Sequence, residues 1–248
     1  MRSTSYESIA DEYEESRGGQ ARADQIAAAI DRHLPSQSLL LDVGVGTGII
    51  AATLERHGHR VVGVDIAPGM LRHSSSRLPG RVGLADGLAL PVARASVDGV
   101  VFVWVLHHVA DPVAALAEAR RALKASGCVL ALAARPVEGE SDIREAFSPL
   151  LALHLGRMDQ VQDLAPLAPQ AGLEITATTG VVMPFEESPN DLARKVGRRM
   201  YSPTFDMDDA TFARDVQPVI DALRALPDPD RPRHREHRHE LVVLRPTA

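Results

Sequence analysis

The chain has 248 residues, 45% of them apolar, and a formal net charge of −6, which describes an acidic globular protein with one large domain or two small ones. The acidic balance disfavours nucleic acid as a partner, because nucleic-acid-binding proteins need a basic surface. The single cysteine, Cys128, excludes an internal disulfide, and the polar N-terminus and short apolar runs predict a cytoplasmic protein with no membrane partner.

The first half of the chain alternates between predicted helices and strands. Apolar residues at helical spacing predict a helix over 20–34. Strands are expected at 38–43, 60–66, 81–86, 96–106 and 128–134, and helices at 48–57, 67–78 and 111–127. The last helix has Asp111 as its N-cap, Pro112 in its first turn and Gly127 as its stop. This alternation predicts an α/β fold with a doubly wound, mostly parallel sheet.

The second half is richer in helix. Helical pieces are expected at 140–156, 159–171 and 189–226, and strands at 173–185, with a bend at Gly180, and at 239–246. The helices are therefore insertions between the last three strands of the sheet.

A glycine-rich turn follows the first strand, in "LLLDVGVGTGII" (39–50). It reads as a buried strand, a tight turn and the start of a helix. Glycine lets a bulky ligand approach the backbone, as dinucleotides and S-adenosylmethionine do, although close helix–strand packing would also explain it. A dinucleotide fingerprint, G-x-G-x-x-G, fails because Ile49 occupies its last position. The pattern present is D-x-G-x-G-x-G, over 42–48.

Acidic residues end three successive strands. Asp42 lies in the first strand, Asp65 closes the second and Asp86 follows the third. The strand ends of a parallel sheet surround one crevice, where carboxylates accept hydrogen bonds from ribose hydroxyls or an exocyclic amine. Such a site suits a ligand with a positive charge, a ribose and an amine, and it suits a pyrophosphate poorly. Asp86 is also explained as a turn former before Gly87.

These stretches, with "VVGVDIAPGML", "GLADGLALPVARASVDGVVFVWVLHHVADP" and "EARRALKASGCVLAL", resemble the class I S-adenosylmethionine-dependent methyltransferases of the small-molecule, type 11 group. The resemblance is close over 6–135. It implies a seven-stranded sheet with an antiparallel last strand, and S-adenosylmethionine as cofactor. It implies that Gly44, Gly46 and Gly48 pass under the methionyl part, and that Asp65 binds the ribose. The whole implied cofactor set is Tyr13, Arg17, Asp42, Gly44, Gly46, Gly48, Asp65, Ile66, Met70, Asp86, Gly87 and Val103.

The resemblance also implies a single domain, 1–248, whose segments have different roles. Residues 1–34 are expected to form lid helices in which Tyr13 and Arg17 close over the cofactor, and 38–135 to form the cofactor-binding core. The helical insertions 136–171 and 186–232 are expected to cap the acceptor pocket.

Histidines supply two further candidates. His107 and His108 follow the fourth strand, and we favour His107 as a general base, although a structural role for both is an equal alternative. His237 and His239 have a spacing that fits a metal, but an exposed basic strand edge is the preferred interpretation, so no metal site is predicted. Arg194, Arg198 and Arg199 either meet an anionic acceptor or form a solvated helix face.

The sequence thus predicts a methyltransferase that acts on an O, N or C nucleophile of a small molecule, as a monomer or homodimer. Two alternatives stay open. One retains the fold and cofactor for non-methylating chemistry such as cyclisation. The other is a nucleic-acid or protein methyltransferase, which the acidic charge disfavours.

Overall fold

The computed structural model describes residues 19–134, 142–152, 161–201, 204 and 207–247. Its helices and 3-10 turns are α3 (Gly19–Asp31), α4 (Ile49–Arg56), α5 (Pro68–Arg77), η1 (Leu106–His108), α6 (Pro112–Ala122), α7 (Asp142–Ala152), α8 (Val161–Leu164), η2 (Pro169–Ala171), α9 (Pro189–Gly197), α10 (Asp209–Asp215) and α11 (Gln217–Arg224). Its strands are β1 (Leu39–Val43), β2 (Arg60–Asp65), β3 (Val82–Leu84), β4 (Val97–Val103), β5 (Leu123–Ala134), β6 (Leu173–Glu187) and β7 (Arg233–Pro246).

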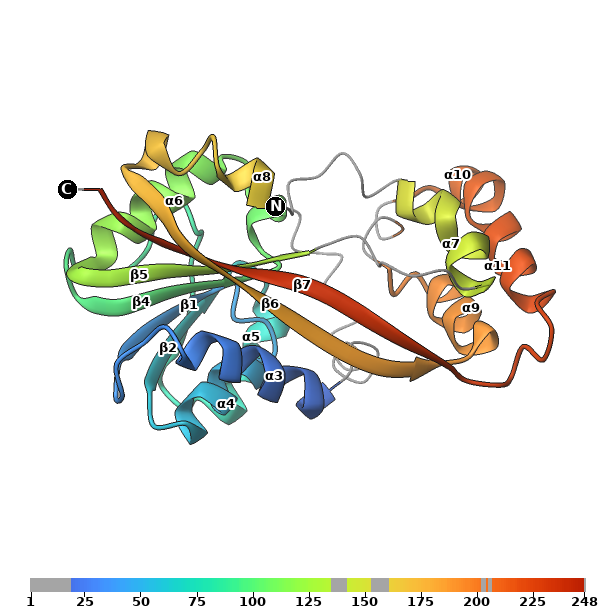
Figure 1. Ribbon diagram of the computed structural model, residues 1–248, viewed down its shortest axis with the longest axis horizontal. Helices are drawn as coiled ribbons and strands as arrows, with labels where there is room; N and C mark the ends of the chain where they lie inside the picture. Colours follow the sequence, from blue (N-terminus) through green and yellow to red (C-terminus); the bar gives the residue numbers. More distant parts are fainter. Residues whose placement is uncertain (1–18, 135–141, 153–160, 202–203, 205–206, 248) are drawn as a thin grey trace.

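The strands form one seven-stranded sheet in the order β3-β2-β1-β4-β5-β7-β6 (Figure 1). The first five strands pair in parallel, and β7 runs antiparallel to both β5 and β6. The predicted α/β fold with an antiparallel last strand is therefore confirmed. The central strands are largely apolar because helices cover both faces of the sheet, and Val100 and Val101 on β4 are completely buried.

Two hydrophobic cores lie on the two faces of this sheet. One is formed with α6, α8 and η2, and the other with α3, α4 and the end of α5. Ile26 and Ile30 of α3 are completely buried in the second core, and each contributes about 1.5–3 kcal/mol. Residues 19–31 of the predicted lid thus form a core helix, and residues 1–18 lie outside the described residues.

A third hydrophobic core lies beyond the end of the sheet, in a lobe that we call the cap. It is formed by α7, α9, α10 and α11, with Leu150, Val196 and Leu223 at its centre. The β6–β7 pair extends past the sheet as a two-stranded ribbon and leads to this cap (Figure 1). The ribbon is long because β5 pairs only with residues 239–244 of β7, whereas β6 pairs with all of 233–246, and the register shift leaves out only Thr176 of β6.

Several predicted boundaries were wrong. The helix capped by Asp111 ends at Ala122 and not at Gly127, because Leu123 already pairs with Val97 of β4. Gly127 instead allows a close approach to β4, where an added Cβ would lie 2.9 Å from the Asp98 carbonyl oxygen. The irregularity of β6 falls between Ile175 and Ala177 rather than at Gly180.

The predicted insertion 136–171 divides between the two halves of the molecule. Its α7 belongs to the cap, whereas α8 and η2 pack on α6 in a core of the sheet. Within the ranges described above, no helix is both long and apolar enough to span a membrane.

The predicted exposed edge at His237 and His239 was also wrong for His239. This residue pairs with Ala134 on one side and Val181 on the other, and its exposed fraction is 9%. His239 is buried because residues 239–244 of β7 lie between β5 and β6, whereas His234 and Arg238 of the basic segment are exposed.

Candidate functional site

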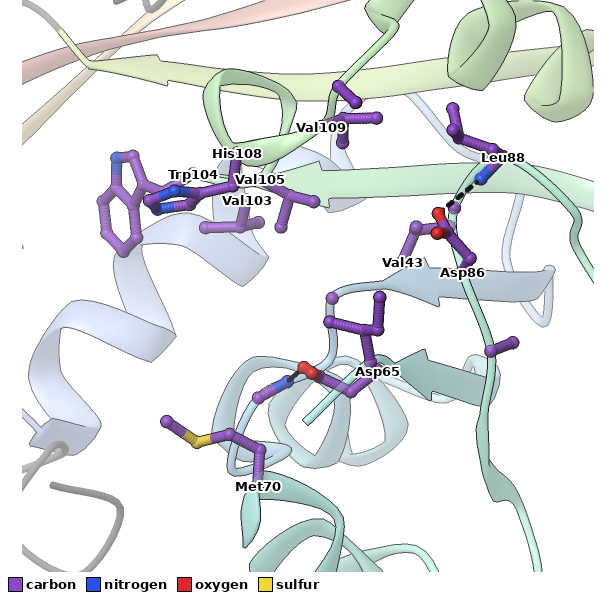
Figure 2. Close-up of a pocket in the computed structure, with 16 residues that line it drawn as sticks. Val43, Asp65, Met70, Asp86, Leu88, Val103, Trp104, Val105, His108 and Val109 are labelled. Carbon is purple, nitrogen blue, oxygen red and sulfur yellow. Dashed lines mark hydrogen bonds between the residues drawn. The ribbon is translucent and has the colours of Figure 1, made fainter. Parts of the chain in front are cut away.

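A pocket opens at the carboxyl ends of β1, β2 and β4, the usual ligand position in a doubly wound sheet. Its empty volume is about 810 Å³, counting space open to solvent. Figure 2 places Trp104 and His108 on one side of the pocket and Asp65 and Met70 on the other. The lining residues are Val43, Gly44, Gly46, Asp65, Ile66, Met70, Ala85, Asp86, Gly87, Leu88, Val103, Trp104, Val105, His108, Val109 and Ala110.

The three glycines of the turn after β1 all have positive φ, but their surroundings differ. An added Cβ at Gly48 would lie 3.1 Å from the Cα of Ser74, so Gly48 allows α4 and α5 to pack closely. At Gly44 it would meet Val105 at 2.4 Å. At Gly46 the nearest atom would be 4.0 Å away, so the space beside this residue is open. Gly44 and Gly46 line the pocket, and the packing explanation holds for Gly48.

Asp65 joins this turn to β2. One carboxylate oxygen accepts a hydrogen bond from the backbone N–H of Gly46 at 2.9 Å, and the other accepts one from Ala67 at 2.8 Å. The side chain is 5% exposed, and burial raises its pKa despite these two donors. Each oxygen keeps a second lone pair with which to accept from a ligand hydroxyl.

Asp42 lies deeper, beneath the same turn, and is 3% exposed. Burial raises the pKa of Asp42 to about 7, and repulsion from the neighbouring Asp65 carboxylate adds to the effect. Two close carboxylates in a buried setting favour a cationic ligand, because a positive charge offsets the cost of ionising both.

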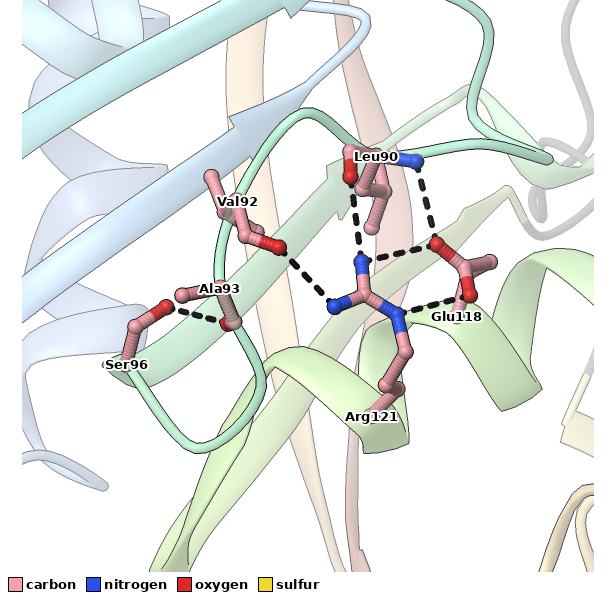
Figure 3. Close-up of polar contacts among 6 residues, drawn as sticks. All are labelled: Leu90, Val92, Ala93, Ser96, Glu118 and Arg121. Carbon is pink, nitrogen blue, oxygen red and sulfur yellow. Dashed lines mark hydrogen bonds and ion pairs between the residues drawn. The ribbon is translucent and has the colours of Figure 1, made fainter.

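Asp86 begins the loop between β3 and β4. It is exposed, and one of its oxygens accepts from the N–H of Leu88 at 3.0 Å, so the turn-forming role is present. The loop is held further along by Arg121 of α6, which donates to the carbonyl oxygens of Leu90 and Val92 at 3.0 and 2.9 Å (Figure 3). Glu118 pairs with Arg121 and accepts from the N–H of Leu90. This network holds the loop that also carries the lining residues Asp86, Gly87 and Leu88.

Trp104 is the lining residue with the least common backbone conformation. Its φ is 54°, which costs a residue other than glycine roughly 1–2 kcal/mol. Such strain in a pocket wall is a sign of function. From the sequence, Val103 was expected near the cofactor and Trp104 in the core or the cleft wall. Trp104 lines the pocket, because the residues directly after a central strand continue the same wall.

His107 and His108 lie in η1, and only one of them faces the pocket. His108 lines the pocket, whereas His107 is not among the lining residues. The two rings are in contact, with centroids 3.8 Å apart. The choice of His107 as the general base thus gains no support from the pocket and stays a prediction.

Most of the predicted cofactor set converges on this pocket. Gly44, Gly46, Asp65, Ile66, Met70, Asp86, Gly87 and Val103 line it. Asp42 and Gly48 are not lining residues. Asp42 lies close enough to Asp65 for the two carboxylates to repel each other, and Gly48 allows α4 and α5 to pack closely. Tyr13 and Arg17 lie outside the described residues. The lining residues that the predicted cofactor set did not include are Val43, Ala85, Leu88, Trp104, Val105, His108, Val109 and Ala110.

Known proteins match the same part of the chain. The methyltransferase domain family matches residues 41–131. A ubiquinone biosynthesis O-methyltransferase of Dinoroseobacter shibae is 34% identical over 177 residues, which cover 64% of this chain and 71% of that protein. A demethylmenaquinone methyltransferase of Thermobifida fusca is 38% identical over 106 residues, 40% of this chain and 44% of that protein. The chain thus spans less than half of the length of some relatives that it matches.

Solved structures share the fold. A candidate methyltransferase from an antibiotic biosynthesis pathway of Anabaena variabilis has a TM-score of 0.65 and 18% identity, over 90% of this chain and 99% of that one. The cyclase SpnF has a TM-score of 0.62 and 18% identity, over 99% and 96%. At these identities the likeness concerns the fold alone.

The chain belongs to the class I S-adenosylmethionine-dependent methyltransferase family. Membership of this family implies S-adenosylmethionine as the cofactor.

Proposed function

We propose that this protein transfers a methyl group from S-adenosylmethionine to a small molecule. The observation that carries the proposal is the contact of the Asp65 carboxylate with the N–H of Gly46, in the turn that opens onto the pocket. A buried carboxylate held by the glycine turn is suited to the hydroxyls of a ribose whose neighbouring group passes over Gly46.

The residues present fit this cofactor. The space beside Gly46 admits a ligand against the backbone, and Asp42 and Asp65 provide negative charge for a cationic one. Ile66 and Met70 offer apolar contact for a flat base, and Asp86 offers an oxygen to an exocyclic amine. The sequence-based roles of Tyr13 and Arg17 remain part of the proposal.

When bound, the cofactor supplies an electrophilic methyl group on a sulfonium. The chain's own contribution is to align the acceptor with that group and to exclude water, which supplies roughly 7–11 kcal/mol in favourable cases. Trp104, Val105 and Val109 give the pocket an apolar wall for this purpose. His108 is the imidazole able to take a proton from an acceptor in this pocket, and it is better situated than His107.

The acceptor is proposed to be a small molecule that enters between the sheet and the cap. The names of the relatives, which concern ubiquinone and menaquinone biosynthesis, favour an O or C nucleophile on an aromatic ring. The insertion 186–232, which includes α9, α10 and α11, is proposed to shape the acceptor side. Cyclisation is the weaker alternative, since the likeness to the cyclase is one of fold.

Calorimetry with S-adenosylhomocysteine tests the cofactor directly, and absence of binding would overturn the proposal. Incubation with S-adenosylmethionine and a library of small phenols, amines and acids tests the reaction. Methyl transfer gives a product heavier by one methyl group together with S-adenosylhomocysteine, whereas cyclisation gives a product of unchanged mass. A gel shift with RNA and DNA at physiological salt tests the nucleic-acid alternative.

The role of the histidines is tested by His108→Ala and His107→Ala. If His108 is the base, its loss lowers kcat by about 10²–10⁴-fold and removes an ionisation from the pH profile. The matched His107→Ala variant is then expected to keep that ionisation.

A further inference from the structure

A row of aromatic side chains leads from the pocket toward the cap. The ring of Trp104 meets His239 edge-on, with centroids 5.2 Å apart. His239 lies 5.9 Å from His237, and His237 stacks on Phe185 with centroids 4.3 Å apart and an angle of 5° between the rings. We call these four residues the aromatic row. Three of them, Trp104, Phe185 and His237, are only half-buried, so the row retains accessible surface.

The row ends at a buried arginine. The guanidinium carbon of Arg235 lies 5.2 Å from the centre of the Phe185 ring, and the residue is 8% exposed. Its Nη1 donates to the carboxylate of Glu187 at 2.9 Å. Its Nε is buried and has no hydrogen-bond partner among the described residues. Leaving a charged donor without a partner is costly, so the site is incomplete as it stands.

The charges around Arg235 also do not cancel. Glu187 accepts from both Arg235 and Lys195, the latter at 2.8 Å, so two cations share one carboxylate. The neighbouring pair of Arg233 with Asp142 is already balanced. Burial lowers the pKa of Arg235, as expected for a cation that lacks full compensation. An anionic ligand would supply both the missing charge and the missing acceptor.

We propose that the aromatic row and Arg235 form the binding wall for an acceptor that is elongated, aromatic and anionic. This inference rests on the proposed function, because it places the methylated end of the acceptor beside Trp104 in the pocket. The anionic group lies at the other end, on Arg235, and the rings between them contact the conjugated body.

The length of the acceptor follows from the strand. His239 and Arg235 are four residues apart on β7, which corresponds to about 13 Å at the usual rise of a strand. A single ring with a carboxylate is shorter than this distance. The class that fits has two or three connected rings and an acidic group remote from the nucleophile.

The test uses the full chain and three probes of similar length. They are biphenyl-4-carboxylate, its neutral analogue biphenyl-4-methanol, and the aliphatic acid decanoate. Affinities are measured by calorimetry in the presence of S-adenosylhomocysteine. Trp104 is the only tryptophan of the chain, so its fluorescence reports binding at the pocket end of the row. We expect the aromatic acid to bind about tenfold more tightly than either control, and to change the emission of Trp104.

Variants of Arg235 and Phe185, with a matched control, separate the contribution of the charge from that of the aromatic ring. Arg235→Gln is expected to abolish the preference for acid over alcohol, Arg235→Lys to retain part of it, and Phe185→Leu to remove the preference for aromatic over aliphatic acid. Arg238→Gln is the control, because Arg238 is an exposed arginine of the same strand, paired with Glu236. It is expected to behave as the wild type.

Equal affinity for acid and alcohol, binding of no probe, or an equal loss in Arg238→Gln would overturn the inference. If Arg235→Gln does not fold, Arg235→Lys and Phe185→Leu still decide it. All variants are expected to bind S-adenosylhomocysteine within twofold of the wild type. Failure of the wild type to bind S-adenosylhomocysteine overturns the proposed function itself, whereas its binding without any acid preference overturns the acceptor class alone.

Discussion

The part of the molecule that contains the sheet and the pocket, which we call the pocket half, differs from the cap in the groups that form its contacts. In the pocket half, backbone groups dominate: glycines with positive φ, N–H groups that Asp65 accepts from, and carbonyl oxygens that Arg121 holds. The bond from Gly46 to Asp65 joins the ends of the neighbouring strands β1 and β2. In the cap, side chains dominate, and residues such as Phe147 of α7 and Tyr201 after α9, with ring centroids 5.0 Å apart, come from distant parts of the chain.

The two halves therefore differ in how readily their residues can be substituted. A site of backbone groups depends on the fold and accepts few substitutions, which suits a cofactor that does not vary. A site of side chains on a ribbon and a separate lobe changes residue by residue, which suits an acceptor that differs between enzymes. The following predictions test whether the two halves are as separate as their cores indicate.

The largest effect is expected from a cavity in the cap. Leu223→Ala removes a completely buried side chain of α11 and should cost about 2–5 kcal/mol of stability. Because the cap has its own core, the affinity for S-adenosylhomocysteine should stay within about threefold, less than 1 kcal/mol. Urea unfolding and calorimetry check both values. The control Leu130→Ala, in the sheet core, should impair both, and equal loss of cofactor binding in the two variants would contradict the separation.

A pH dependence is expected from Asp42. Its pKa is raised from 3.8 to about 7 in the folded protein, so the folded state keeps a proton that the unfolded state has lost. Stability therefore falls as pH rises from about 4 through 7, by up to about 4 kcal/mol. Asp42→Asn should flatten this slope, as measured by urea unfolding at pH 5 and 8. An unchanged slope would show that Asp42 is ionised throughout, and the cap variant Leu223→Ala should keep the wild-type slope.

A loss of affinity is expected from Asp65→Ala. The variant removes the acceptor for the ribose hydroxyls and should weaken S-adenosylhomocysteine binding by about 1.5–3 kcal/mol, the range for hydrogen bonds to a charged group. Calorimetry measures this change. Asp86→Ala is the matched control, since Asp86 is exposed and already engaged with Leu88, and its effect should be smaller. Unchanged affinity in Asp65→Ala would refute the ribose assignment.

The smallest effect is a difference between two glycines. Gly46→Ala and Gly48→Ala both place a side chain at positive φ, at roughly 1–2 kcal/mol each. Gly48→Ala should lose further stability, because its Cβ meets the backbone of Ser74, whereas the Cβ of Gly46 enters open space. Gly46→Ala should instead lose more affinity for S-adenosylhomocysteine. Thermal unfolding and calorimetry on both variants measure the two effects. A larger loss of stability in Gly46→Ala and a larger loss of affinity in Gly48→Ala would contradict the roles given to the two glycines.

The alternation of helices and strands and the glycine turn could be predicted from the residues alone. These features are local, because apolar runs and caps such as Asp111 specify strands and helix starts without reference to distant residues. The sequence also predicted that Asp42, Asp65 and Asp86 surround one crevice, since the ends of parallel strands meet at one edge. The prediction failed at Gly127, where a tertiary contact overrode the local helix-stop signal, because pairing of Leu123 with β4 ended the helix early.

The environment of the basic C-terminal segment could not be predicted from local patterns. Arg235 and His239 have the composition of an exposed edge, yet both are buried. His239 lies between β5 and β6 and contacts Trp104, and Arg235 lies in the β6–β7 ribbon and pairs with Glu187. The same holds for the histidine pair, where the turn of η1 directs His108 to the pocket. In each case the environment of a side chain depends on strands and turns far away in the sequence, whose positions no local pattern encodes.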